Sequence, residues 1–115
     1  DNANALQVKT QINLIKNAIT KKHNENVLLA VDNVVENLDD KQINTKDQLL
    51  FTNILNHPIL STNEIQKEFA KWIKVSTNSY KIYLSNRQSV IFNYDSANAT
   101  FDCDYTNDTC KELYQ

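Results

Sequence analysis

The residues of this chain best placed to do chemistry are its two cysteines, Cys103 and Cys110, which lie close together near the C-terminus. A disulfide between them would close a short loop and stabilise the fold by about 2 to 3 kcal/mol, by lowering the entropy of the unfolded chain. Such a bond forms in an oxidising compartment. We expect the disulfide because the two cysteines are the chain's only pair and share one turn-rich segment. Two unpaired thiols are the alternative, and a zinc site is not favoured without a neighbouring histidine.

The remaining polar groups do not form the pattern of an active site. The two histidines, His23 and His57, adjoin no cysteine or serine in a nucleophile signature. We therefore expect no enzyme activity, no catalytic or metal-binding residues and no cofactor. Two carboxylate clusters stand out, Asp39 with Asp40 and a second cluster near the C-terminus. The second consists of Asp102, Asp104, Asn107 and Asp108.

The C-terminal carboxylate cluster offers hard oxygen donors of the kind that bind calcium. It lacks the spaced glycine and the terminal glutamate of an EF-hand loop. We therefore interpret this cluster as a solvated acidic turn, with calcium binding as the alternative.

Length and composition bound the class of protein. The 115 residues predict a single domain over residues 1–115, and 41% hydrophobic with 23% charged residues fits a folded globular protein. The net charge is −2 and the lysines are scattered, so no direct contact with nucleic acid is indicated. The chain has no glycine, so we expect asparagine and aspartate wherever a turn needs a positive φ.

The chain begins at Asp1 rather than at methionine. We interpret Asp1 as a processed mature end or an artificial boundary, so any targeting or membrane segment before it is not visible. No run of about eighteen apolar residues occurs within the chain itself.

A stripe of apolar residues at steps of three and four predicts an amphipathic helix over residues 1–23. Asn24 to Asn26 are expected to end this helix. Fewer than three heptads are present, so the stripe is expected to pack on the protein's own sheet rather than in a coiled coil. This helix packing face consists of Ala5, Val8, Ile12, Ile15 and Ile19.

Residues 24–76 are expected to form a variable region of helices and loops. The segment Val27 to Leu38 fits either a buried strand or a short helix, and we favour the helix. A polar loop then runs from Asp39 to Lys46. Thr45 is predicted to cap a further helix that ends before Pro58.

The end of this middle region is ambiguous. Ser61 and Glu64 stand at capping-box spacing, which predicts one more helical turn through Ile65 and Phe69. The segment from Trp72 to Val75 could equally begin the sheet.

From Tyr80 the apolar residues recur at every second position, which is the period of a strand. Residues 77–115 therefore predict an antiparallel meander, with strands around Tyr80 to Leu84, Ser89 to Tyr94 and Ala99 to Cys103. So few strands cannot bury their own apolar face, and the N-terminal helix is the expected cover. The predicted fold class is α+β: one long helix on a three- to four-stranded antiparallel meander, closed by a C-terminal disulfide loop.

This sequence resembles the type IV pilin and type II secretion pseudopilin family over most of its length. The first matching segment is Gln7-Val8-Lys9-Thr10-Gln11-Ile12, which is similar to the family's helix beyond its membrane-spanning half. The later ones are Leu55 to Pro58, Trp72, Tyr80-Lys81-Ile82-Tyr83, Phe92-Asn93-Tyr94 and Thr100-Phe101-Asp102-Cys103. The family commonly has a glycine before the threonine and phenylalanine of the last strand, where this chain has Ala99. Some pseudopilins bind calcium through a C-terminal loop.

The resemblance implies a structural subunit, a pseudopilin or minor pilin, of a type IV pilus-like, type II secretion or DNA-uptake filament. It places this domain in the bacterial periplasm, held at the inner membrane by an N-terminal hydrophobic helix absent from this sequence. Its implied partners are other pilin-like subunits and an inner-membrane assembly platform. Cys103 and Cys110 would fix a loop that neighbouring subunits contact, while the fragment alone is expected to be monomeric or weakly associating. The alternative is a small secreted or periplasmic binding or adaptor domain without a membrane anchor.

Overall fold

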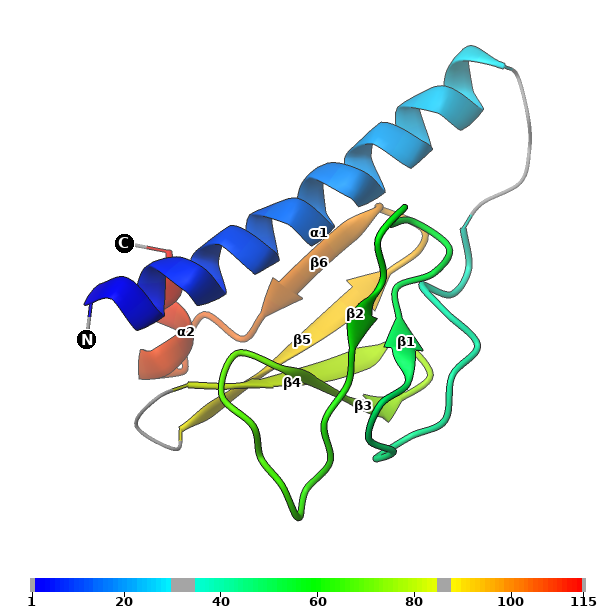
Figure 1. Ribbon diagram of the computed structural model, residues 1–115. Coiled ribbons are helices and arrows are strands. Elements are labelled where there is room, and N and C mark those ends of the chain that lie inside the picture. Colours follow the sequence, from blue (N-terminus) through cyan, green and yellow to red (C-terminus); the bar gives the residue numbers. More distant parts are fainter. Residues whose placement is uncertain (1, 30–34, 85–87, 115) are drawn as a thin grey trace.

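The computed structural model describes residues 2–29, 35–84 and 88–114, with side chains from Leu6 onward. One N-terminal helix lies along a four-stranded antiparallel sheet, and a short helix closes the C-terminal end, so the fold is α+β (Figure 1). The helices are α1 (Asn2–Leu28) and α2 (Asp108–Leu113). The strands are β1 (Leu49–Leu50), β2 (Ile59–Leu60), β3 (Trp72–Ser76), β4 (Ser79–Tyr83), β5 (Ser89–Asp95) and β6 (Thr100–Cys103).

Helix α1 contributes its apolar stripe to the core. Val8, Ile12, Ile15 and Ile19 are all buried and belong to one hydrophobic cluster with the sheet. Ala5 lies on the helix, but its side chain is outside the described residues. Burying side chains of this size contributes about 1.5 to 3 kcal/mol each, so this face supplies much of the helix's stability.

The predicted end of the first helix at Asn24 to Asn26 is wrong, because α1 continues to Leu28. The amide of Leu29 still donates to the carbonyl of Glu25 at 3.1 Å, so the helical hydrogen bonds run past the asparagines. Asparagine disfavours a helix interior by less than about 1 kcal/mol, which neighbouring turns easily offset. The described ends of the segment from Val27 to Leu38 do not form the separate helix predicted there: residues 27–28 end α1 and residues 35–38 are irregular. The middle of that predicted helix, residues 30–34, lies outside the described residues.

The sheet has the strand order β3-β4-β5-β6, with every neighbouring pair antiparallel. Alternate residues of β5 are buried, namely Val90, Phe92 and Tyr94, as the period of two predicted. The turn predicted from Asp95 to Asn98 is present, with turn residues at 96–99. The turn predicted at Ser85 to Gln88 falls largely outside the described residues. Strand β3 adds the fourth strand, so the interpretation in which Trp72 begins the sheet is correct.

The helix predicted to begin at Thr45 does not form. Strands β1 and β2 pair as a short antiparallel ladder in its place. Asp47 and Phe51 have φ values of 63° and 64°, which a right-handed helix cannot accommodate. Side chains satisfy the backbone here: Asp39 accepts from the amide of Phe51 at 2.9 Å, and Ser61 accepts from the amide of Gln48 at 2.9 Å.

The capping box predicted at Ser61 and Glu64 does not form either. The Glu64 carboxylate accepts from Lys81 at 2.9 Å and from the hydroxyl of Tyr83, both on β4. Residues 64–66 make only a turn, and Lys67 then has a φ of 47°. Between residues 35 and 84, the described chain therefore contains strands and turns but no helix.

Aromatic rings fill the space between α1 and the sheet. Phe92 and Phe101 stack at 5.1 Å between ring centroids, and Trp72 meets each of them at 5.6 Å. The indole of Trp72 also donates to the side-chain oxygen of Gln11 at 3.0 Å, and the Gln11 amide donates to the carbonyl of Ala70 at 2.9 Å. Gln11 thus joins α1 to the start of β3, and its two hydrogen bonds fix the rotation of α1 about its axis relative to the sheet.

Positive φ values are not confined to asparagine and aspartate, so that expectation is only partly correct. Among the described residues they occur at Asn44, Asp47, Phe51, Lys67, Ala70 and Ala99. Phe51 and Ala70 are also buried. Packing of their side chains in the core therefore holds their backbone in the left-handed region, which normally favours glycine.

Candidate functional site

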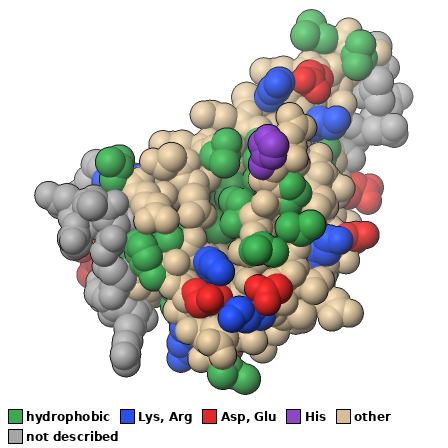
Figure 2. Space-filling model, viewed as in Figure 1, with side chains coloured by type: hydrophobic (Ala, Val, Ile, Leu, Met, Phe, Trp, Pro, Cys, Tyr) green, Lys and Arg blue, Asp and Glu red, His purple; other side chains and the backbone are tan. Residues whose placement is uncertain are grey.

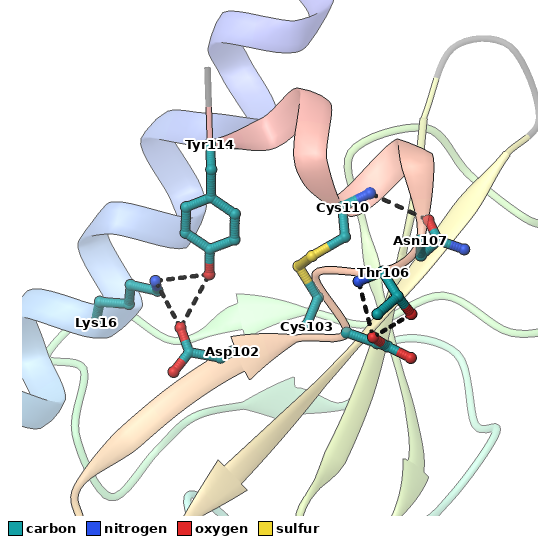
Figure 3. Close-up of a disulfide and its surroundings, with 8 residues drawn as sticks. Lys16, Asp102, Cys103, Thr106, Asn107, Cys110 and Tyr114 are labelled. Atoms are coloured by element: carbon teal, nitrogen blue, oxygen red, sulfur yellow. Dashed lines mark hydrogen bonds and ion pairs between the residues drawn. A yellow bond between two sulfur atoms is a disulfide. The ribbon is translucent and has the colours of Figure 1, made fainter.

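The C-terminal segment is closed by the disulfide predicted between Cys103 and Cys110. Cys103 ends β6 and Cys110 lies in α2, with their Cα atoms 6.0 Å apart (Figure 3). Cys110 is fully buried and belongs to the core cluster. The disulfide therefore ties α2 covalently to the last strand of the sheet.

The short loop inside the disulfide is ordered by its own polar side chains. Asn107 is the N-cap of α2, and its side-chain oxygen accepts from the amide of Cys110 at 3.1 Å. The carboxylate of Asp104 accepts from the amide and the hydroxyl of Thr106 at 2.9 and 2.7 Å (Figure 3). These bonds hold the pKa of Asp104 below its ordinary value. The predicted acidic turn is thus a charged loop whose backbone is held by the disulfide and by the side chains of Asp104 and Asn107.

A triad of Lys16, Asp102 and Tyr114 fastens the end of the chain to α1. The Lys16 ammonium lies 3.0 Å from Asp102 and 2.8 Å from the Tyr114 hydroxyl, which donates to Asp102 at 2.9 Å (Figure 3). The ammonium also lies 4.4 Å from the centre of the Tyr114 ring. Partial burial alone would raise the pKa of Asp102, but the bonds from Lys16 and Tyr114 outweigh it and lower that pKa. Sequence reasoning did not connect these residues, which come from three separate elements.

A second triad of the same residue types, Lys74, Asp39 and Tyr80, is buried. Lys74 on β3 meets Asp39 at 2.7 Å, and the hydroxyl of Tyr80 donates to the same carboxylate at 2.7 Å. The amides of Lys41 and Phe51 also donate to Asp39, at 3.0 and 2.9 Å. Burial alone would raise the pKa of Asp39, but these hydrogen bonds lower it. Burial, together with the hydrogen bond to Asp39, raises the pKa of Tyr80.

A groove runs between the second half of α1 and the turn at residues 52–57. It encloses about 510 Å³, and its lining includes Leu14, Ala18, Lys21, Lys22 and Glu25 from α1, with Ile54, Leu55 and His57 facing them. Figure 2 shows hydrophobic side chains grouped near a histidine on this face, with charged side chains around them. Two segments about thirty residues apart build this groove, so no local sequence pattern signalled it.

The candidate chemical residues fall at different places in the fold. His23 lies exposed within α1 rather than at its end, and His57 lies exposed at the bend before Pro58. Asp102 and Asp104 are engaged with protein donors. In the described part of the chain, no group of three His, Cys, Asp or Glu residues is arranged to hold a metal ion. The C-terminal region presents a charged surface, with Asp104 and Asp108 exposed.

Comparison with known proteins finds no matching family model, curated protein or solved structure. Over the residues that the structure describes, neither helix is long and apolar enough to cross a membrane.

Proposed function

We propose that this chain is the periplasmic domain of a pilin-like structural subunit, a pseudopilin or minor pilin. The observation that carries the proposal is the arrangement of three parts: an apolar helix stripe, a meander beneath it, and a C-terminal segment tied to the last strand by a disulfide. A domain built in this way serves as a rigid body attached to its helix. It has no need of catalysis, a metal or a cofactor.

The backbone at Ala99 supports the same proposal. Ala99 has a φ of 55°, immediately before the Thr-Phe pair of β6. The left-handed region favours glycine, because a Cβ atom there crowds the following carbonyl group. The pilin family that this sequence resembles commonly has a glycine at this position, and the backbone of Ala99 adopts the conformation that such a glycine would favour.

In this proposal α1 links the domain to an upstream hydrophobic helix, which anchors the subunit in the inner membrane and later packs in the filament. The domain itself faces outward. Its C-terminal loop, held by the disulfide and by the triad of Lys16, Asp102 and Tyr114, presents a fixed acidic surface to neighbouring subunits.

The test is the behaviour of the natural full-length protein in its own cells. We expect it to fractionate with the inner membrane and to cross-link to other pilin-like subunits. We also expect its deletion to impair filament-dependent secretion, motility or DNA uptake. A full-length protein that leaves the cell as a free monomer, with all three processes intact after deletion, would overturn the proposal.

The groove beside α1 favours a second candidate, a small secreted or periplasmic binding domain. Its volume of about 510 Å³ lies within the range of small-molecule sites, about 300 to 1,000 Å³. The experiment above separates the two candidates, because a binding domain of this kind needs neither an anchor nor filament partners.

A further inference from the structure

The groove between α1 and residues 52–57, called here the α1 groove, combines an apolar floor with a basic rim. Leu14, Ile54 and Leu55 supply apolar surface, and Leu14 is 50% exposed although it lies in the groove. Lys21 and Lys22 line the same groove, together with His57; Glu25 is its one acidic residue. Within the described chain, neither Lys21 nor Lys22 has an ion-pair partner. The groove therefore suits a partner that brings an apolar group flanked by negative charge.

The loop inside the disulfide, residues 104–108, has this chemistry and is called here the acidic loop. Tyr105 is 57% exposed, and Asp104 and Asp108 lie on either side of it in the sequence, both exposed. The disulfide, the Asn107 cap and the bonds within the loop hold it in one shape. Binding a preformed loop costs less ordering entropy than binding a flexible one.

The acidic loop of a given molecule is held away from its own groove. Tyr114 is fixed to Lys16, and α2 packs beside Lys9, Ile12 and Asn13 in the first half of α1. The groove lies along the face of α1 that carries Leu14, Ala18, Lys21 and Glu25, and Lys16 lies about 200° around the helix from Leu14 and Ala18. A contact between the two surfaces must therefore join two copies of the chain.

We propose that the α1 groove receives the acidic loop of a second copy, with Tyr105 against the apolar floor and the neighbouring carboxylates facing Lys21 and Lys22. The two surfaces differ, so the contact is heterologous and leaves one free groove and one free loop on every pair. Such contacts build open chains rather than closed dimers unless the rotation closes a ring. The inference rests on the proposed subunit function, for which it supplies a lateral contact between soluble domains.

The test uses the soluble chain and a charge swap. Variant A carries Lys21→Glu and Lys22→Glu, so both its groove and its loop are acidic. Variant B carries Asp108→Lys and Glu112→Lys, where Glu112 is an exposed residue one helical turn beyond Asp108 on α2. The surface beside the loop and the groove are then both basic. For either variant alone, the association constant for self-association should fall by about tenfold or more, because like charges then face each other. A mixture of A and B should associate again, since each groove meets a loop of opposite charge.

Sedimentation velocity over a range of concentrations measures the association, and circular dichroism checks that each variant is folded. A control with Lys41→Glu and Lys67→Glu changes the net charge as variant A does but leaves the groove intact, and it should behave as the wild type. Adding salt should weaken the wild-type contact, since the Debye length is about 10 Å at 0.1 M. In nuclear magnetic resonance spectra of labelled A, unlabelled B should shift the signals of residues 14–25 and 52–57.

A wild type whose sedimentation is independent of concentration, or a mixture that stays monomeric, would overturn the contact and leave the groove to some other partner. Shifts confined to other surfaces would overturn it as well. These outcomes are separate from failure of the proposed function. If the full-length protein cross-links in filaments but the mixture of A and B stays monomeric, only this contact is overturned. If the mixture of A and B associates but the full-length protein leaves the cell as a free monomer, only the filament role is overturned.

Discussion

The molecule contains the same three residue types, lysine, aspartate and tyrosine, in two triads that differ in their exposure to water. In the buried triad, the side chains of Lys74 and Asp39 are 5% and 0% exposed. In the surface triad, those of Lys16 and Asp102 are 29% and 56% exposed. The lysine nitrogen and the aspartate oxygen are 2.7 Å apart in the buried triad and 3.0 Å apart in the surface triad, so these distances alone do not show which triad stabilises the fold more.

The difference between the two triads is the cost of breaking them. Removing one partner of a buried pair leaves an unpaired charge in the core, which costs about 3 to 5 kcal/mol. An exposed pair competes with water and salt and contributes about 0 to 1 kcal/mol. The buried triad therefore decides whether the irregular middle of the chain folds, whereas the surface triad only adjusts how the C-terminal segment lies on α1.

The largest effect is expected for Asp39→Ala. It leaves the Lys74 ammonium unpaired and removes the acceptor of the Phe51 and Lys41 amides, so the free energy of unfolding should fall by about 3 to 5 kcal/mol. Urea denaturation measures the change. Asp40→Ala is the matched control, because the Asp40 side chain is 91% exposed and its removal should change stability by less than about 0.5 kcal/mol. Equal losses at the two positions would show that the buried contacts of Asp39 do not set the cost of its removal.

Neighbouring residues on α1 give the next test. Ile15→Ala should cost about 2 to 5 kcal/mol, because Ile15 is fully buried between α1 and the sheet. Lys16→Ala removes only the centre of the surface triad and should cost about 1 kcal/mol or less. Thermal or urea unfolding of both variants makes the comparison. A Lys16 variant as unstable as the Ile15 variant would show that the surface triad matters as much as the core.

Removing the disulfide tests what really holds the C-terminal segment. The double variant Cys103→Ser and Cys110→Ser should lose about 2 to 3 kcal/mol, more than the surface triad can supply. Intact mass of the unreduced wild type should show the two-hydrogen deficit of the disulfide. If the double variant is as stable as the wild type, the triad and the packing of α2 already suffice.

Acid titration is expected to show the smallest difference. The folded pKa values of Asp39 and Asp102 are both lowered. Their stabilising contributions are therefore complete above the unfolded carboxyl pKa, and are lost as the pH falls through each folded pKa. Asp102→Asn should reduce the acid-dependent loss by about 1 kcal/mol or less, and by less still in high salt. A variant whose stability no longer depends on acid pH would mean that Asp102, not Asp39, dominates.

The two halves of the fold differ in how far the sequence predicts them. The α1 stripe and the alternation of Val90, Phe92 and Tyr94 are periodic, so local pattern was enough to indicate a helix over a meander. The middle region depends on single contacts, such as Asp39 with the amide of Phe51, that join residues twelve positions apart. Leu50 and Leu55 are buried in the core although the helix expected after Thr45 does not form, so contacts distant in sequence rather than a helical period account for their burial.

The candidate surfaces repeat this division. The disulfide could be predicted because the chain has only two cysteines, whereas the groove could not, because it exists only once residues 52–57 fold against α1. One local feature of the sequence indicates the buried triad: a lysine, Lys74, lies inside the apolar segment from Trp72 to Val75. A charged residue at a buried strand position needs a partner, and that partner lies thirty-five residues earlier in the chain.

The position of the disulfide has a mechanical consequence. Cys103 and Cys110 lie seven positions apart, and this stretch of chain would span about 25 Å if pulled straight. In the oxidised chain their Cα atoms stay 6.0 Å apart, so tension applied through the C-terminus passes from Cys110 across the disulfide to Cys103 and enters β6. Residues 104–109 then bear none of this load, although the last residues of α2 still do. Under tension the oxidised chain therefore yields less length at this point than the reduced chain.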